Sequence, residues 1–345
     1  QVDHAAWQAA LLAEMRHEHA IAGGEALDSI FFGGGTPSLM PPALVAVLLA
    51  EAERLWGFAE GIEITLEGNP SSVEAANYAA LAACGINRVS LGLQSLDDGA
   101  LRFLGRLHDA DEGLRALDVA QQNFARVSFD LIYALPGQTP QQWEAQLARA
   151  LGFGTGHLSL YQLTIEPGTR FATMVRQHDL YELTGSMTEA AGLPAYEISN
   201  YARPGEESRH NLTYWRYQDY CGIGPGAHGR RGGMATVRHK KPENWLAAVA
   251  DRGSGLSEER ALPPTEQASE ALLMGLRLRE GIDLAVLAGR FGLAGSALID
   301  ADKAAFYARQ RLVWQEGSRI GVTAQGLSLL DGLLGELVRP ELVAG

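Results

Sequence analysis

Apolar segments rich in β-branched and aromatic residues alternate with helix-like segments along the first two thirds of the chain. Six such segments are Leu27–Phe32, Ile62–Glu67, Arg88–Leu93, Val127–Ile132, His157–Leu163 and Tyr196–Asn200. Short apolar runs of this composition are typical of buried strands. Neighbouring segments lie roughly 30 residues apart, the length of one strand–helix unit. The pattern therefore predicts an α/β fold with parallel strands and right-handed crossovers.

Several helices between these strands have identifiable ends. Ser71 and Glu74 form a capping-box pattern ahead of a predicted helix. That helix extends over Ala75–Cys84, and Gly85 is placed to end it. Two prolines open another helix, whose broad apolar stripe is suited to packing on a sheet. This helix begins at Pro41 and Pro42 and carries Leu44, Val45, Leu48, Leu49, Leu55 and Trp56 in its stripe.

The first helix of the chain has no strand before it. It carries Trp7, Leu11, Leu12 and Met15 on one face. Because the other helices of this region follow a strand, and because the chain starts without Met, we expect a first strand upstream of Gln1.

The pattern becomes mainly helical after about Gly233. Predicted helices cover Ala268–Arg279, Ile282–Phe291, Ser296–Arg309 and Ala324–Val338. A predicted β-hairpin, Leu312–Trp314 with Arg319–Val322, precedes the last of these helices. Helices followed by a small hairpin resemble a winged-helix-like module. We therefore predict an α/β domain over residues 1–233 and a mainly helical, winged-helix-like C-terminal domain over residues 234–345.

The composition is that of an ordinary soluble globular protein. Of the 345 residues, 46% are hydrophobic and 20% are charged. The formal net charge of −13 argues against nucleic acid as the main partner. The chain has no run of about 18 apolar residues, so we expect no membrane span, and peripheral membrane association stays open. Its two cysteines, Cys84 and Cys221, exclude a disulfide framework and predict a cytoplasmic location.

Glycine and polar residues stand where the predicted strands end, which is the usual ligand-binding edge of an α/β sheet. The backbone of Gly33–Gly35 could hold a phosphate, or a carboxylate and an amine. The loop lacks the Lys-Ser/Thr of a P-loop and does not fit G-x-G-x-x-G. Two roles of this loop therefore stay open: a simple tight turn, or the phosphate site of a sugar-phosphate or nucleotide enzyme.

Two carboxylates stand near the strand ends. Glu67 can accept hydrogen bonds from an ammonium group or a ribose. Asp130 lies inside an otherwise apolar strand and needs a partner if it is buried, because an unpaired buried charge is costly. Arg106 is the nearest cation in the sequence. A structural ion pair between Asp130 and Arg106 is therefore the alternative to a ligand-binding role.

Six short motifs follow one another along the chain. They are Gly33-Gly34-Gly35-Thr36-Pro37, Glu67-Gly68-Asn69-Pro70, Gly92-Leu93-Gln94-Ser95, Gly105-Arg106, Asp130–Tyr133 with Leu135-Pro136-Gly137-Gln138-Thr139, and Tyr161–Thr169. In this order and spacing, the chain resembles the oxygen-independent coproporphyrinogen III oxidase group of radical S-adenosylmethionine (SAM) proteins. Within that group, His210-Asn211-x-x-Tyr214-Trp215 resembles the heme chaperone branch rather than the true oxidases.

The resemblance implies a partial (β/α)6 radical SAM barrel that holds SAM against a [4Fe–4S] cluster. Gly34, Gly35 and Thr36 would contact the methionyl end of SAM. The other polar contacts would come from Glu67, Gln94, Arg106 and Asp130, with Thr164 as a looser candidate. Glycine backbone, carboxylates and an arginine suit the amino group, the hydroxyl groups and the carboxylate of SAM.

The cluster needs three cysteine thiolates, which the family supplies in a C-x3-C-x2-C loop. That loop is not in this sequence, and Cys84 and Cys221 cannot supply three ligands. We expect the loop upstream of Gln1, beside the missing first strand. A paralogue that has lost the cluster is the alternative. At Gln177–Tyr181 the family has a longer acidic connection than this chain. We therefore expect that a loop is missing here, which would appear as a break in the chain between about His178 and Tyr181.

A polar and aromatic group of residues forms the candidate heme site: His210, Asn211, Tyr214 and Trp215. Here an imidazole ligand and aromatic rings would flank a porphyrin. The alternative is that His210 and Asn211 brace a loop across the barrel by hydrogen bonds. His228 is a second candidate ligand, or a residue that closes the SAM pocket.

The resemblance thus predicts a heme chaperone with SAM and a [4Fe–4S] cluster in a supporting role. Such a protein binds heme and passes it to an apo-hemoprotein acceptor, respiratory hemoproteins included. The alternative within the family is an oxygen-independent coproporphyrinogen III oxidase, which decarboxylates its substrate oxidatively to protoporphyrinogen IX.

Overall fold

The computed structural model describes residues 3–35, 37–163 and 177–343. The chain divides into two compact units. Unit 1 comprises Gln1–Asp28, Ala43–Ile62 and Asn211–Gly345, and unit 2 comprises Ser29–Pro42 and Glu63–His210. The domain boundary at residue 233 stays a prediction.

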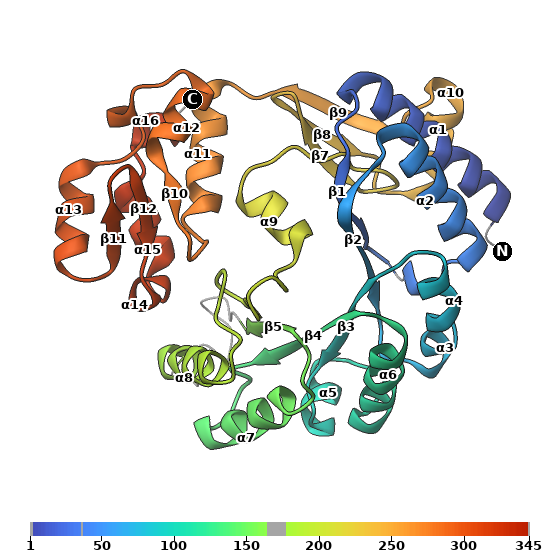
Figure 1. The fold of residues 1–345 in the computed structure, drawn as a ribbon, viewed down its shortest axis with the longest axis horizontal. Coiled ribbons are helices and arrows are strands. Elements are labelled where there is room, and N and C mark those ends of the chain that lie inside the picture. The colour runs from blue at the N-terminus through green and yellow to red at the C-terminus, as the bar shows by residue number, and fades with distance from the viewer. Residues whose placement is uncertain (1–2, 36, 164–176, 344–345) are drawn as a thin grey trace. The chain divides into compact units, whose positions relative to one another are not determined.

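A six-stranded sheet has the strand order β1-β2-β3-β4-β5-β6. Its strands are β1 (Leu27–Phe32), β2 (Phe58–Gly68), β3 (Arg88–Gln94), β4 (Arg126–Tyr133), β5 (His157–Gln162) and β6 (Asn200–Ala202). The pairs β2–β3, β3–β4 and β4–β5 are parallel, which the strand–helix spacing predicts. The curled, mostly parallel sheet confirms the predicted half-barrel (Figure 1).

The last strand differs from its prediction in position and direction. The segment Tyr196–Asn200 was predicted as a parallel strand, whereas β6 pairs antiparallel with β5. The Tyr196 N–H donates to the Asn200 carbonyl at 3.1 Å, and Ala195 forms a bridge with Tyr201. Because the chain reverses tightly over the predicted residues, it enters the sheet in the opposite direction.

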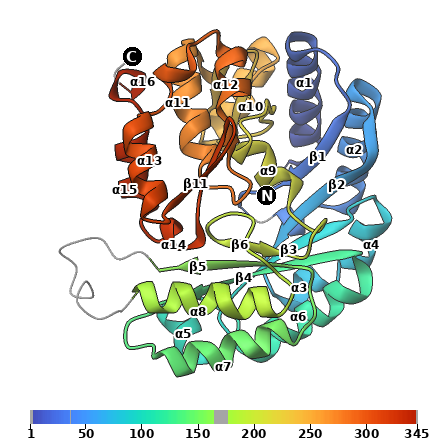
Figure 2. The same ribbon diagram turned by 60° about the vertical axis from the view of Figure 1, so that its left-hand side comes forward.

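Side chains alternate between the two faces of β2, β3, β4 and β5. Residues of the apolar face are buried: Ile64, Leu66, Val89, Leu91, Leu93, Val127, Phe129, Leu131, Leu158 and Leu160. Helices α5 (Asp98–Phe103), α6 (Ala110–Asn123), α7 (Pro140–Leu151) and α8 (Gln177–Ala190) lie along one side of β3–β5 (Figures 1 and 2). The opposite face is mostly polar, and we call it the polar face.

Two helix predictions are corrected. The helix predicted over Ala75–Cys84 is two short helices, α3 (Ser72–Ala75) and α4 (Tyr78–Ala83). The first begins earlier than predicted because the Ser71 hydroxyl accepts the Glu74 N–H at 3.3 Å, and a capping residue directly precedes its helix. Helix α8 runs unbroken from Gln177 to Ala190, so the expected chain break after His178 is wrong.

Unit 1 contains a three-stranded antiparallel sheet that the sequence pattern did not indicate. It consists of β7 (His228–Arg231), β8 (Met234–Arg238) and β9 (Leu256–Ala261). Its strands are rich in charged residues, and β9 is largely exposed, so they carry no apolar signal. Helices α1 (His4–Ala22), α2 (Pro42–Trp56) and α10 (Pro242–Arg252) precede or interrupt these strands in the chain.

A buried ion network joins α1 to this sheet. Glu18 pairs with Arg231 and with Arg238, at 2.7 Å in each case. Glu14 accepts the backbone N–H groups of Gly224 at 2.7 Å and Gly255 at 2.8 Å. Two carboxylates thus face two guanidinium groups, and their attraction offsets the desolvation penalty of burying the four charges.

The C-terminal part of unit 1 is mainly helical, as predicted. Its helices are α11 (Pro264–Gly275), α12 (Leu284–Phe291), α13 (Ala301–Arg309), α14 (Ala324–Leu327), α15 (Leu330–Leu337) and α16 (Pro340–Val343). The predicted hairpin is β11 (Val313–Glu316) with β12 (Arg319–Val322), and β10 (Ile282–Asp283) pairs with β12. Asp283 was predicted as helix but caps α12, because its carboxylate accepts the N–H groups of Ala285 and Val286.

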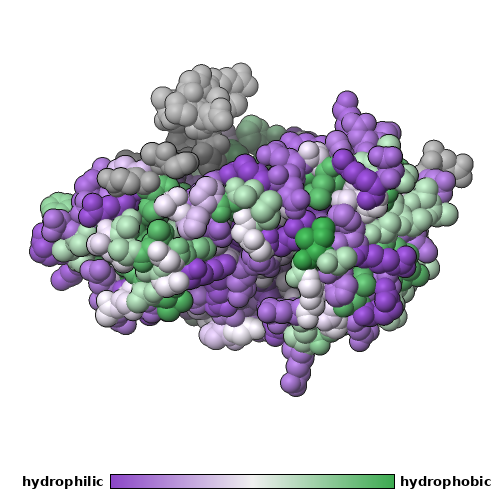
Figure 3. All heavy atoms as spheres, turned by 90° about the horizontal axis from the view of Figure 1, so that it is seen from above, coloured by the Kyte–Doolittle hydropathy of each residue, from purple (hydrophilic) through white to green (hydrophobic). Residues whose placement is uncertain are grey.

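The surface view in Figure 3 is largely hydrophilic, with hydrophobic side chains in small separate groups. Large exposed hydrophobic side chains occur in both units, for example Val286 in unit 1 and Leu107 in unit 2. None of the described helices has the length and apolar character needed to cross a membrane.

A buried hydrogen bond between α7 and α8 offers a test of the packing in unit 2. The Trp143 ring stacks on Tyr133 at 4.8 Å, and its Nε1–H donates to the Thr184 hydroxyl at 2.8 Å. Thr184→Val keeps the side-chain shape but leaves the indole N–H buried without an acceptor. We expect the free energy of unfolding to fall by about 1–3 kcal/mol, measured by urea denaturation.

Thr188→Val on the same helix is the matched control. Thr188 is also fully buried, but its hydroxyl donates only to carbonyls of its own helix. Its loss therefore leaves no donor without a partner, and the stability should change less. Equal losses for the two variants would show that the Trp143 contact is not what stabilises this interface.

Candidate functional site

A glycine loop leaves β1 beside the polar face of unit 2. Gly34 and Gly35 have φ values of +77° and +60°, which favour glycine. The Gly34 N–H donates to Glu67 Oε2 at 3.2 Å. A Cβ at Gly33 would lie 2.5 Å from the Phe31 ring, so a side chain there would force a shift. The loop and the Glu67 carboxylate are therefore in direct contact.

Asp130 projects from β4 onto the same polar face. Its carboxylate accepts a hydrogen bond from the Ser90 hydroxyl at 3.5 Å, and the neighbouring Ser159 hydroxyl also lowers its pKa. Burial raises the pKa of Asp130 to about 6, and the charge of Glu67 acts in the same direction. The two serines and Arg88 oppose this shift only in part. Glu67 and Asp130 are thus two carboxylates within electrostatic reach of each other.

The cation beside Asp130 is not the predicted one. Arg88 on β3 acts on the carboxyl group, because β3 and β4 are neighbouring strands. Arg106 lies exposed in the connection between α5 and α6. Among the described contacts it has no ion pair with Asp130. Proximity across the sheet, and not along the sequence, decides the partner of this carboxylate.

Gln94 ends β3 in an unusual backbone conformation. Its φ is +66°, and the register with β4 shifts between Leu91 and Gln94. The side chain is buried, and its amide nitrogen would lie 3.1 Å from a Cβ built on Gly92. Strained backbone of this kind is found at binding sites more often than elsewhere. The two remaining candidates, Thr36 and Thr164, lie outside the described residues.

These residues suit the polar groups of SAM. Two carboxylates can accept hydrogen bonds from an ammonium group or ribose hydroxyls, and the Gln94 amide can both donate and accept. The negative charge of the pair also favours a cationic ligand. Glu67 and Gln94 stand near the ends of β2 and β3, Gly34 follows β1, and Asp130 lies inside β4.

A [4Fe–4S] cluster does not fit the described residues. The chain has two cysteines, fewer than the three thiolates required. Cys84 is half-buried, with Sγ 3.3 Å from the Pro42 carbonyl oxygen, and Cys221 is exposed. The part of the chain that the structure describes holds no group of three or more His, Cys, Asp or Glu able to bind a metal ion. The cysteine loop upstream of Gln1 stays a prediction.

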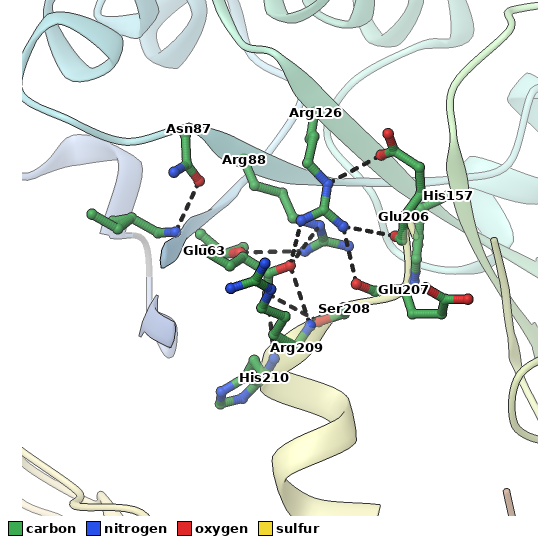
Figure 4. A network of polar contacts seen from close by, with 12 residues as sticks. Glu63, Asn87, Arg88, Arg126, His157, Glu206, Glu207, Ser208, Arg209 and His210 are labelled. Carbon is green, nitrogen blue, oxygen red and sulfur yellow. Dashed lines mark hydrogen bonds and ion pairs between the residues drawn. The ribbon is translucent and has the colours of Figure 1, made fainter. Parts of the chain in front are cut away.

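Below the strand ends lies a polar network that sequence reasoning missed (Figure 4). Glu63 on β2 pairs with Arg126 on β4 at 2.8 Å and lies 4.0 Å from Arg88 on β3. His157 on β5 bonds the Ser128 hydroxyl at 2.7 Å, and burial lowers the pKa of His157 well below its usual value. The signal was the alternation of Glu63 and Glu67 with apolar residues along β2.

His210 is the second residue of α9 (Arg209–Trp215) and belongs to unit 2. Its ring stacks on Phe31 with centroids 4.0 Å apart and planes 12° from parallel. Burial lowers the pKa of His210 to about 4, so its imidazole is neutral at physiological pH. Its backbone N–H donates to Glu63 at 3.3 Å. The bracing hydrogen bonds of this segment therefore include one to Glu63, a residue that the sequence had not indicated.

The other candidate heme residues belong to unit 1. Asn211, Tyr214 and Trp215 continue α9 after His210. The Tyr214 ring packs on Tyr220 at 4.5 Å, and the Arg277 guanidinium lies 5.9 Å from the Trp215 ring centre. The exposed His228 begins β7 in the same unit.

Two family models match the chain. The Radical SAM superfamily matches residues 8–149, and the HemN C-terminal domain matches residues 262–329. Coproporphyrinogen III oxidase (HemN) from Escherichia coli has a similar structure, with a TM-score of 0.78 and 24% identity over 96% of this chain and 83% of that one. At this identity the likeness shows a shared fold.

Curated relatives narrow the family. The chain is 35% identical to heme chaperone HemW of Haemophilus influenzae, over 89% of this chain and 82% of that protein. It is 32% identical to HemW of Bacillus subtilis, over 95% and 91% of the two chains. It is 42% identical to the mouse mitochondrial radical S-adenosyl methionine domain-containing protein 1, of whose length the match spans 66%. The predicted resemblance is confirmed, and the chain belongs to the HemW family of radical SAM proteins.

Proposed function

We propose that this chain binds heme and transfers it to an apo-hemoprotein. The observation that carries the proposal is the match to proteins named heme chaperone over most of their length. The His210-Asn211-x-x-Tyr214-Trp215 motif, which lies on α9, supports it. The acceptor is a protein with an empty heme pocket, and the acidic charge of the chain does not favour nucleic acid.

His210 is the residue proposed to bind the heme iron. A neutral imidazole is the form that binds metals, and the low pKa of His210 keeps it neutral. Stacking on Phe31 limits the orientations of its ring. Tyr214 and Trp215 are the aromatic residues of the same sequence motif.

SAM is proposed to lie at the carboxyl ends of β1–β4. Bound SAM supplies an activated sulfonium group for radical chemistry. The chain's own part is to bind and orient it: Glu67 and Asp130 accept hydrogen bonds, and the Gly34–Gly35 backbone lets the ligand approach closely. Heme binding is proposed to use the segment that carries His210, with SAM and a [4Fe–4S] cluster in a supporting role.

The other functions have weaker support. Oxidative decarboxylation of coproporphyrinogen III rests on a likeness of fold alone. A phosphate site at Gly33–Gly35 is disfavoured by the family and by charge, because the Gly34 N–H already donates to the Glu67 carboxylate. A carboxylate at that position repels a phosphate.

Heme titration tests the role of His210. His210→Ala removes the proposed iron ligand and should weaken heme binding by about tenfold or more, with a shift of the Soret band. His4→Ala is the control, because His4 is exposed on α1. Absorbance titration of each purified variant gives both readouts. An unchanged affinity and spectrum for His210→Ala would move the ligand to another residue.

The transfer step has its own kinetic test. Direct transfer requires a complex of the heme-loaded chain with the acceptor, so the rate should rise with acceptor concentration before it levels off. Release of heme into solution followed by capture would give a rate independent of that concentration. Stopped-flow absorbance with a soluble apo-cytochrome b as the acceptor distinguishes the two. A concentration-independent rate would contradict handover to this acceptor.

Asp130→Asn should stabilise the fold and weaken SAM binding. The folded-state pKa of Asp130, about 6, lies above its usual value of 3.8, so ionisation opposes folding as the pH rises through this window. The variant removes that penalty. We expect its free energy of unfolding to exceed that of the parent by about 1–3 kcal/mol at pH 8, and by almost nothing at pH 4.

Urea denaturation at the two pH values measures the stability difference, and calorimetric titration with SAM measures the affinity. Asp251→Asn is the control, since Asp251 is exposed on α10. A stability difference that is the same at both pH values would show that Asp130 ionisation is not its cause. Unchanged SAM affinity would remove Asp130 from the proposed SAM site.

A further inference from the structure

Glu63 is a buried carboxylate to which the proposed function gives no role. It lies on β2, four residues before Glu67, and on the same face of the strand. Its side chain is 1% exposed. Burial of a carboxylate is unfavourable unless cations and hydrogen-bond donors surround it. The groups that surround Glu63 therefore indicate the role of this buried carboxylate.

Two guanidinium groups compensate the charge of Glu63. Arg126 donates to Oε2 at 2.8 Å, and Arg88 lies 4.0 Å from the same oxygen. A second carboxylate balances the two guanidinium groups, because Arg126 Nε also pairs with Glu206 at 3.1 Å. The group is stable as a network of charges, and removal of any one of them would leave the others without compensation.

Glu63 also accepts hydrogen bonds from the start of α9. The backbone N–H groups of Arg209 and His210 donate to its two carboxylate oxygens at 3.2 and 3.3 Å, and the Ser208 hydroxyl lies 3.5 Å away. The first N–H groups of a helix have no partner inside the helix. Here a carboxylate of a distant strand accepts them, as Figure 4 shows.

Arg126 binds the two residues before Ser208 as a hydrogen-bond donor, whereas Glu63 acts as an acceptor. Its Nη2 group donates to the carbonyl oxygens of Glu206 at 2.8 Å and Glu207 at 3.0 Å. Glu63 thus binds backbone donors and Arg126 binds backbone acceptors of one continuous segment, residues 206–210. The pair fixes the path of this segment across β2 and β4.

His210 is consequently held both at its backbone and at its side chain. Glu63 holds its backbone N–H, and the Phe31 ring stacks on its side chain. We propose that Glu63, compensated by Arg126, is a positioning residue that sets the orientation of the His210 ring for the heme iron. This inference rests on the proposed function, in which His210 binds the iron.

A double-mutant cycle tests whether Glu63 acts through His210. Glu63→Asp keeps the charge that compensates Arg126 but withdraws the carboxylate from the backbone N–H groups. We expect heme affinity to fall about tenfold, a size usual for residues that orient a metal ligand. In the His210→Ala background the same change should cause no further loss. Glu60→Asp, at an exposed position of the same strand, should leave the affinity unchanged.

A heme-free measurement separates this inference from the proposed function. Stacking on Phe31 shifts the NMR signals of the His210 ring, observed with 13Cε1-labelled histidine and assigned with His210→Ala. Glu63→Asp should move these signals toward their unstacked positions, and Glu60→Asp should not. If His210→Ala alone leaves heme affinity unchanged, the ligand role of His210 fails, and the NMR signals alone decide whether Glu63 orients the ring.

Two results would overturn the positioning role. One is a Glu63→Asp effect on heme affinity that is equally large without His210, since Glu63 would then act by another route. The other is an unchanged NMR position of the His210 ring in the variant. Folding of each variant is checked by circular dichroism. Glu63→Gln, which keeps the shape and loses the charge, is the second variant and should give the same pattern.

Discussion

Compensation of buried charge on the polar face of the sheet is the constraint on which unit 2 depends. Strands β2–β5 present their apolar side chains to the helices, so their other side chains must face one another. Glu63, Arg88 and Arg126 stand on three neighbouring strands, where the carboxylate faces both guanidinium groups. The compensation also determines where the later segment 206–210 can lie, because its backbone completes the hydrogen bonds that the charged groups require.

The carboxylates near the strand ends of the same face are not compensated in this way. Glu67 and Asp130 lie within reach of each other, and the nearby Arg88 does not restore the pKa of Asp130 to its usual value. A pair of carboxylates without a matching cation is unfavourable for folding. It is suited to a ligand that brings positive charge of its own, and SAM carries both a sulfonium and an ammonium group. This imbalance supports the proposed SAM site.

The sequence predicts the parts of the fold that have strong local signals. Apolar runs indicated five strands of the sheet, and strand ends indicated the glycine loop, Glu67 and Asp130. The pattern failed where structure depends on partners. Strand β6 is reversed by a tight turn, and the charged strands β7–β9 carry no apolar pattern. Arg106 was chosen for its nearness in sequence, whereas Arg88 reaches Asp130 across the sheet.

The two layers of the polar face are linked through β2. Glu63 and Glu67 stand four residues apart on this strand, a separation of about 13 Å along an extended backbone. One contacts the segment that carries His210, and the other contacts the glycine loop. Strand β2 lies between β1 and β3, so neighbouring strands pair with both of its edges. One strand therefore positions both the glycine loop and the segment that carries His210.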